Sequence, residues 1–64
     1  MRTWLIQLRN DSGLTQTEVA AKASISQNYY SCIEKYGRTP TISVAKRIAA
    51  VLGFDWTKLY ESGD

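Results

Sequence analysis

The chain has 64 residues, of which 44% are hydrophobic, and a formal net charge of +2 at pH 7. A chain of this length forms one domain, expected over residues 1–64, and is too short to shield a substrate pocket from water, which argues against an enzyme. Histidine is absent and cysteine occurs once. We therefore expect no zinc site, no intramolecular disulfide and no cofactor.

The sequence shows no secretion signal and no apolar run of the roughly 20 residues that a membrane helix needs. We therefore expect a soluble protein of the cytoplasm, in a bacterium the cytoplasm or nucleoid, and no membrane partner. The net charge alone is too small to predict a nucleic-acid partner, because that argument depends on where basic residues cluster.

Apolar residues recur at helical rather than strand spacing, so we expect an all-α fold, a compact bundle of about five short helices. The first helix is predicted from about Thr3 to Asp11, with Leu5 and Leu8 on its apolar face and a stop at Ser12-Gly13. Ile6 falls off that face and is expected to be exposed.

The second helix has a clear start, because Thr15-Gln16-Thr17-Glu18 matches a capping box. In this motif the Thr15 hydroxyl and the Glu18 carboxylate each accept a hydrogen bond from the other residue's backbone N–H. Leu14 and Val19 are spaced as the hydrophobic staple that accompanies such a cap.

A third helix is predicted to start near Ser26, whose side chain can cap it while Ile25 and Tyr30 form a staple. Ser24 is a competing cap, with Gln27 as its partner. The pattern breaks over residues 36–40, where Gly37 and Pro40 predict a loop.

The fourth helix is expected from about Thr41 to a left-handed stop at Gly53. Its apolar stripe is formed by Ile42, Ala45, Ile48, Ala49 and Leu52. Asp55 can cap a last short helix that carries Trp56, Leu59 and Tyr60, with Phe54 and Leu59 as a staple. Trp4, Trp56 and Tyr60 are interpreted as core aromatics.

The second and third helices form a pair joined by a tight turn. Its inward side chains are Val19, Ala20, Ala23, Ile25, Tyr30 and Ile33. At about 100° per residue, the opposite face of the third helix carries Gln27, Asn28, Ser31, Cys32 and Lys35, with Tyr29 at the margin. Amides can donate and accept at the edge of adenine, and small side chains permit close approach to bases. An ordinary solvated polar face is the alternative, but the capped helix and turn that precede it favour DNA reading.

The segments LTQTEVAAKASISQNYYSCIE, GRTP and AKRIAAVLGF together resemble the Cro and XRE-type helix-turn-helix repressors of phages and bacteria. The resemblance covers nearly the whole chain and implies a lambda repressor-like DNA-binding fold. It includes the opening Leu14-Thr15-Gln16, Ala20 at the helix crossing, Ile25 after the turn, and Ile33-Glu34 near the end of the third helix. Two departures are Ser24, at a position that is usually glycine, and Gly37, which lies one residue late.

The resemblance implies roles for individual residues. Base contacts are expected from Gln27, Asn28, Ser31 and Cys32, and phosphate contacts from Gln16, Thr17, Tyr29, Lys35 and Arg38. Gln16 is also expected to orient Gln27, and Tyr29 lies between two roles, at the core margin or on DNA. Arg9 and Glu34 match positions that pair in similar repressors, which makes Glu34 structural.

These observations predict a sequence-specific double-stranded DNA-binding transcriptional regulator, a repressor, with no catalytic residues. The alternative is a protein-interaction or antitoxin-like module with the same fold. Repressors of this type act as homodimers on palindromic operators with half-sites about 34 Å apart. We expect the dimer contact at exposed parts of Phe54, Trp56, Leu59 or Tyr60, and a regulatory protein partner is a further possibility.

Overall fold

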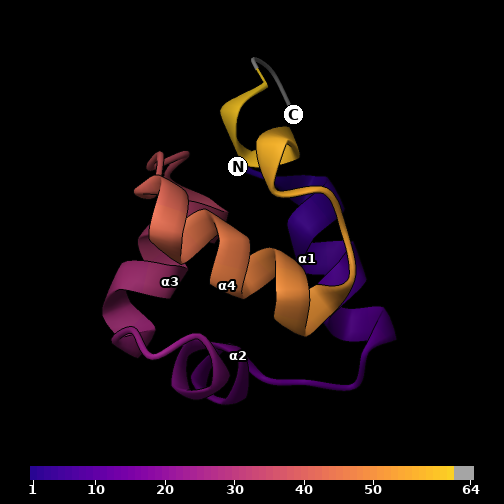
Figure 1. Cartoon of the computed structure of the whole chain (residues 1–64). Coiled ribbons are helices and arrows are strands. Elements are labelled where there is room, and N and C mark those ends of the chain that lie inside the picture. Colours follow the sequence, from indigo (N-terminus) through magenta and orange to yellow (C-terminus); the bar gives the residue numbers. More distant parts are fainter. Residues whose placement is uncertain (62–64) are drawn as a thin grey trace.

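The computed structural model describes residues 1–61, which form four α-helices, one short 3₁₀ helix and, within this range, no strand. The elements are α1 (Thr3–Asp11), α2 (Gln16–Lys22), α3 (Gln27–Lys35), α4 (Ile42–Leu52) and the 3₁₀ helix η1 (Trp56–Tyr60). In Figure 1, α4 crosses the middle of the molecule, with α3 to its left, α1 to its right and α2 below. The structure confirms the all-α class and the five short elements, the last of which is 3₁₀ rather than α.

The helix starts follow from local hydrogen bonds that the sequence encodes. Thr15 Oγ1 accepts from the backbone N–H of Glu18 at 3.1 Å, and Glu18 Oε1 accepts from that of Thr15 at 2.8 Å. Ser26 Oγ accepts from the N–H of Tyr29 at 3.1 Å, so Ser26 and not Ser24 caps α3. The side chains of Thr41 and Asp55 cap α4 and η1 in the same way.

The core lies where the helix pair α2–α3 meets α1, α4 and η1. Its fully or almost fully buried apolar residues are Leu5, Val19, Ala20, Ala23, Tyr30, Ile33, Val44, Ala45, Ile48, Leu52 and Leu59. Of the inward side chains expected for α2–α3, all are buried except Ile25, which is half-buried and packs against this cluster. Burial of these residues holds the pair together as the spacing predicts.

One core position of α4 was misassigned. Ile42, expected on the apolar stripe, is 55% exposed, whereas Val44 is buried. By rotation of about 100° per residue, the arc of the five buried residues Val44, Ala45, Ile48, Ala49 and Leu52 has its centre about 90° from Ile42, which therefore lies at the edge of the buried face. Ile42 is also the first residue of α4, so it lies at the end as well as at the edge of the stripe.

The buried face of α1 is rotated from the one expected. Ile6, expected to be exposed, is half-buried, and so is Leu8. Arg2 is buried and Arg9 is half-buried. Because these two arginines lie on the Ile6 side of Leu5 by helical rotation, the inward face extends toward Ile6.

The last element differs from expectation in two residues. Leu59 is fully buried and is therefore unable to contribute to a dimer contact. Tyr60, interpreted as a core aromatic, is 41% exposed, and its hydroxyl donates to the carbonyl oxygen of Pro40 at 2.6 Å. The rings of Trp4 and Phe54 meet edge to face at 5.0 Å, which fixes the turn after α4 against α1.

A buried arginine ties the two ends of the described chain to the loop after α3. The Arg2 guanidinium donates to the carbonyl oxygens of Ile33 at 2.6 Å, Arg38 at 2.8 Å and Leu59 at 3.1 Å. These three acceptors belong to α3, to the loop after it and to η1. Burial lowers the pKa of Arg2, and the three carbonyl oxygens supply the hydrogen bonds that water would otherwise make.

The turn between α2 and α3 contains a left-handed residue that is not glycine. Ser24 has φ 60°, and it follows the end of α2 in a Schellman arrangement. The N–H of Ser24 donates to Ala21 O at 3.2 Å, and that of Ile25 donates to Ala20 O at 3.0 Å. A residue other than glycine is strained at positive φ, because its Cβ crowds the backbone. Ser24 therefore occupies a position at which glycine would be favoured.

We predict that Ser24→Gly raises the free energy of unfolding by about 0.5–1 kcal/mol, because removal of the Cβ strain outweighs the greater freedom of glycine in the unfolded chain. The matched control is Ala50→Gly, which places glycine at an exposed position of α4, away from this turn, and should cost about 1 kcal/mol. Urea denaturation of both variants measures the difference. A loss of stability in Ser24→Gly would show that the turn is not strained.

Candidate nucleic-acid interface

Helix α3 separates an inward from an outward face. Tyr30 and Ile33 are fully buried, while Gln27, Asn28 and Lys35 are exposed. Ser31 and Cys32 share the outward face but are half-buried, and Cys32 is a free thiol. The four residues expected to read bases therefore form one continuous surface, in which the two amides project farther than the two small side chains.

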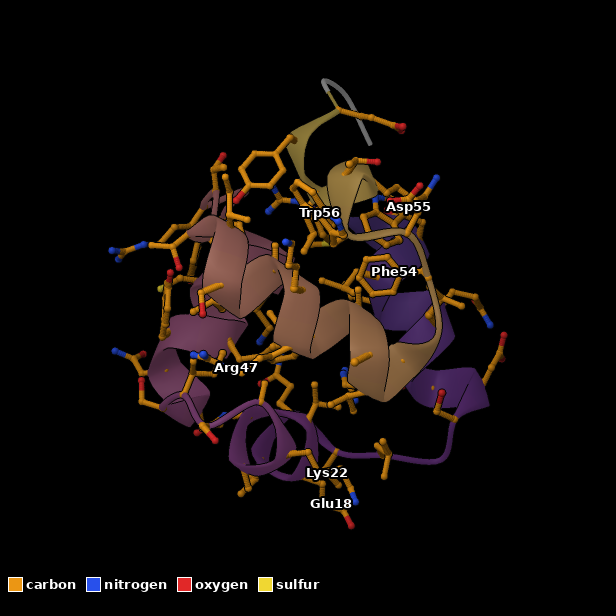
Figure 2. All side chains as sticks on the ribbon, in the orientation of Figure 1. Glu18, Lys22, Arg47, Phe54, Asp55 and Trp56 are labelled. Atoms are coloured by element: carbon orange, nitrogen blue, oxygen red, sulfur yellow. The ribbon has the colours of Figure 1, made fainter. Side chains whose placement is uncertain are left out.

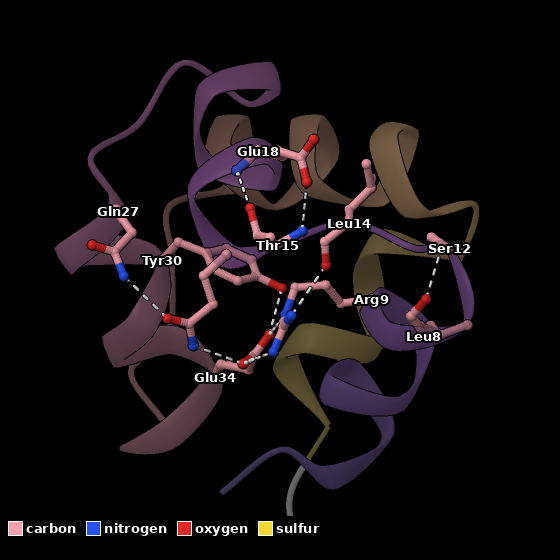
Figure 3. A network of polar contacts seen from close by, with 10 residues as sticks. Leu8, Arg9, Ser12, Leu14, Thr15, Glu18, Gln27, Tyr30 and Glu34 are labelled. Carbon is pink, nitrogen blue, oxygen red and sulfur yellow. Dashed lines mark hydrogen bonds and ion pairs between the residues drawn. The ribbon is translucent and has the colours of Figure 1, made fainter.

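The Glu34 carboxylate is the polar centre of the helix pair, with 1% of the residue exposed. Arg9 Nε donates to its Oε2 at 2.9 Å and Arg9 Nη2 to its Oε1 at 3.2 Å. The Tyr30 hydroxyl donates to Oε2 at 2.7 Å, and Gln16 Nε2 donates to Oε1 at 2.9 Å. Figure 3 shows Arg9 and Tyr30 converging on Glu34. The expected Arg9–Glu34 pair is present, and the cluster joins α1, α2 and α3.

The environment of Glu34 keeps it ionised. Burial alone would raise the pKa of the carboxyl, but hydrogen bonds from Arg9, Gln16 and Tyr30 outweigh burial and the pKa of Glu34 is lowered. Burial and the hydrogen bond to Glu34 together raise the pKa of the Tyr30 hydroxyl, which stays protonated as a donor. The hydrogen bond to Glu34 also raises the pKa of Arg9.

The structure brings Gln16 and Gln27 together. Gln27 Nε2 donates to Gln16 Oε1 at 3.1 Å, across the turn between α2 and α3. Gln16 is half-buried and Gln27 is exposed, so the contact leads from the interior of the helix pair to its surface. Thr17, the other residue expected to touch phosphate from α2, lies exposed in the first turn of this helix.

A basic side chain from the loop after α3 meets an aromatic side chain in the first turn of this helix. The Arg38 guanidinium lies 4.9 Å from the centre of the Tyr29 ring, a cation–π contact. Tyr29 is half-buried against the core, so it lies at the core margin while its ring positions an exposed cation. Lys35 is exposed in the last turn of α3. In the loop that follows, Gly37 is the left-handed residue, with φ 70°. The late glycine therefore still has a role at this turn.

One residue at the interface was not found from the sequence. Arg47 extends from α4 toward the turn between α2 and α3 (Figure 2), and its Nε donates to the carbonyl oxygen of Ala23 at 2.8 Å. Its Nη1 donates to Ser43 Oγ at 2.8 Å. Arg47 thus binds a carbonyl at the end of α2 and fixes the turn that sets α3. Nothing in the helical spacing indicates which carbonyl an arginine of α4 reaches.

Within residues 1–61, no cluster of acidic, cysteine or histidine side chains is suited to hold a metal ion. None of the helices in the same range has the length and apolar character that crossing a membrane requires.

Comparison with known proteins identifies the family. The helix-turn-helix family model matches residues 5–59. The chain belongs to this family. The match confirms the resemblance drawn from the sequence, and in this helix-turn-helix protein α2, the turn at Ser24 and α3 are the unit that gives the family its name.

Curated relatives agree with this assignment. An uncharacterized HTH-type transcriptional regulator of Bacillus subtilis, YqaF, is 48% identical over 61 residues, which are 95% of this chain and 80% of the relative. A second, y4dJ of Sinorhizobium fredii, is 38% identical over 91% of this chain and 75% of the relative. A third, from Methanothermobacter thermautotrophicus, is 36% identical over 83% of this chain and 77% of the relative. No solved structure gives a significant match.

The lowered pKa of Glu34 predicts how stability depends on pH. The pKa of Glu34 lies below the ordinary value of 4.5 in the folded protein, so its contribution is present above about pH 4.5 and is lost as the pH falls through the folded pKa. In Tyr30→Phe one donor to Glu34 is missing, so the pKa of Glu34 is lowered less. The free energy of unfolding should therefore fall less on acidification than it does in wild type.

Urea denaturation of wild type and Tyr30→Phe at pH 7, 5, 4 and 3 measures this difference. Glu18 and Asp55 also have lowered pKa values, but they contribute equally to both proteins and cancel. Parallel stability curves for the two proteins would show that the Tyr30 hydroxyl does not lower the pKa of Glu34.

Proposed function

We propose that the protein is a sequence-specific regulator of transcription that reads double-stranded DNA in the major groove with α3. The observation that carries this proposal is the outward face of α3, where exposed Gln27 and Asn28 present amides rather than charges. The helix-turn-helix family and relatives that are named transcriptional regulators support DNA-binding regulation rather than an enzymatic activity.

The proposed base-reading residues are Gln27, Asn28, Ser31 and Cys32. An amide offers one acceptor and one donor group, which suits the edge of adenine in the major groove. Ser31 and Cys32 are half-buried, so they leave space for a base edge or a thymine methyl to approach the helix closely. The amides would supply directional hydrogen bonds to the base edge, and the small side chains would allow the base to pack closely against α3.

The proposed phosphate contacts surround this face. Gln16 and Thr17 lie in the first turn of α2, and Lys35 and Arg38 lie at and beyond the end of α3. Tyr29 holds the Arg38 guanidinium through the cation–π contact, so a cation is positioned before DNA arrives. Contacts of this kind fix the register of a protein on the duplex and leave discrimination to the base-reading residues.

We further propose that the protein binds a palindromic operator as a homodimer and represses transcription by occupying it. Half-sites in such an operator lie about one helical turn, roughly 34 Å, apart. Since Leu59 is buried, the proposed dimer contact is left to the exposed Tyr60 and the half-buried Trp56 and Phe54. The rings of Trp56 and Tyr60 meet edge to face at 5.9 Å. A regulatory protein partner is the proposed means of release.

Selection of bound duplexes from a random pool tests the function. We predict an enriched palindromic site, and we predict that Gln27→Ala weakens binding to that site by about 1–3 kcal/mol per half-site and relaxes the preference at one base pair of each half-site. Equal weakening on all sequences would mean that Gln27 positions the protein and does not read a base. Failure to enrich any sequence would reject sequence-specific recognition.

The salt dependence of affinity tests the assignment of phosphate contacts. Lys35→Ala should reduce the slope of log affinity against log salt by about 1.8 for the dimer, because one phosphate contact is lost from each half-site and each contact contributes about 0.9. The matched control is Lys22→Ala, since Lys22 is an exposed lysine in the last turn of α2 that lies outside the proposed contacts, so its slope should equal that of wild type. If wild type is not retained on any duplex at low salt, the protein-interaction alternative replaces DNA binding.

A further inference from the structure

A continuous line of hydrogen bonds leads from the buried carboxylate of Glu34 to the exposed end of the Gln27 side chain. Gln16 Nε2 donates to Glu34 Oε1 at 2.9 Å, and Gln27 Nε2 donates to Gln16 Oε1 at 3.1 Å. In Figure 3 the dashed lines run from Gln27 through one intermediate side chain to Glu34. The proposed base-reading residue is therefore connected to a group in the interior.

The direction of this line is set at its buried end. An ionised carboxylate can only accept hydrogen bonds, so the Gln16 atom that lies against Glu34 must be the amide nitrogen. The opposite orientation would place the carbonyl oxygen of Gln16 against a carboxylate oxygen, and two acceptors in contact repel. Arg9 and Tyr30 donate to the same carboxylate from two other directions, so Glu34 has no freedom to turn away.

The constraint passes on to Gln27. Because the amide nitrogen of Gln16 bonds Glu34, its carbonyl oxygen faces α3. Gln27 must therefore donate to this oxygen through its own amide nitrogen. One N–H of Gln27 is thereby occupied. The remaining N–H and the carbonyl oxygen of Gln27 are left for the groove, as one donor and one acceptor. The second N–H of Gln16 also stays free, which is compatible with its proposed contact to phosphate.

This pattern distinguishes the two purines. Adenine presents an acceptor, N7, and a donor, its N6 amino group, whereas guanine presents two acceptors, N7 and O6. One donor and one acceptor on Gln27 match adenine. A reversed Gln27, with its oxygen toward Gln16 and both N–H groups outward, would match guanine instead. The orientation of the amide therefore decides which purine is favoured.

We propose that Glu34 is a positioning residue which, through Gln16, commits Gln27 to adenine and against guanine. The inference rests on the proposed function, because it requires that Gln27 reads a base. It assigns to a buried carboxylate a part in sequence discrimination in addition to its part in holding α1, α2 and α3 together.

The test compares affinities for two duplexes that differ only by A·T or G·C at the base pair whose preference Gln27→Ala relaxes. Fluorescence anisotropy gives the ratio of the two affinities for each protein. Wild type should favour adenine by about tenfold or more, the range for one good bidentate contact. In Glu34→Gln the residue at position 34 is able to donate as well as accept, so Gln16 and Gln27 are free to reverse, and the ratio should fall to within about threefold.

A second variant keeps the proposal testable if Glu34→Gln does not fold. Gln16→Met preserves the length of the side chain and the Arg9–Glu34–Tyr30 contacts but removes the link to Gln27. It should lower the ratio as well. Loss of a phosphate contact at Gln16 would weaken binding to both duplexes equally, so the ratio separates positioning from anchoring. The matched control is Gln7→Met, an exposed glutamine on α1 whose amide bonds Asp11, and its ratio should equal that of wild type.

The outcomes separate this inference from the proposed function. If wild type shows a preference that Gln27→Ala abolishes, and folded Gln16→Met retains that preference in full, Gln27 reads the base but Glu34 does not orient it, and the inference is overturned. If wild type shows no preference that depends on Gln27, the proposed reading by α3 fails first.

Discussion

The ionised carboxylate of Glu34 is buried, and a buried charge is tolerated only when it is paired and hydrogen-bonded. Its donors come from three helices: Arg9 on α1, Gln16 on α2 and Tyr30 on α3. Satisfying one group therefore fixes three elements relative to one another. Because α3 is the proposed reading helix, the same requirement sets how that helix is presented to DNA, and Gln16 extends the constraint to Gln27 at the surface.

Three arginines, like Glu34, hold segments of the fold together, so they add little to the charge that is free to bind DNA. Of the eight lysines and arginines, Arg2, Arg9 and Arg47 are engaged by acceptors inside the protein. They hold the loop after α3, the helix pair and the turn before α3. The cations left at the proposed interface are few, chiefly Lys35 and Arg38. Discrimination by amides on a rigidly held helix thus fits a protein with a small net charge better than broad electrostatic attraction does.

Much of the fold was predictable because helix ends depend on neighbours in sequence. The caps at Thr15 and Ser26 are formed by groups three residues apart, and the side-chain pattern alone identifies them. What sequence reasoning missed depends on packing between distant segments. Arg2 meets carbonyl oxygens 31 to 57 residues away, and the Gln16–Glu34 contact spans 18 residues. The resemblance supplied the Arg9–Glu34 pair and the Gln16–Gln27 link, but the connection between them became visible only in three dimensions.

We infer that the interior orients the proposed reading side chain before DNA is present. Relaxation of the side-chain ¹⁵N nuclei of Gln16 and Gln27 in the free protein tests it directly, with exposed Gln7 as reference. We expect Gln16 to be as ordered as rigid backbone, with an order parameter of about 0.85, and Gln27 to be more ordered than Gln7. A Gln16 order parameter below about 0.6, with Gln27 no more ordered than Gln7, would contradict it.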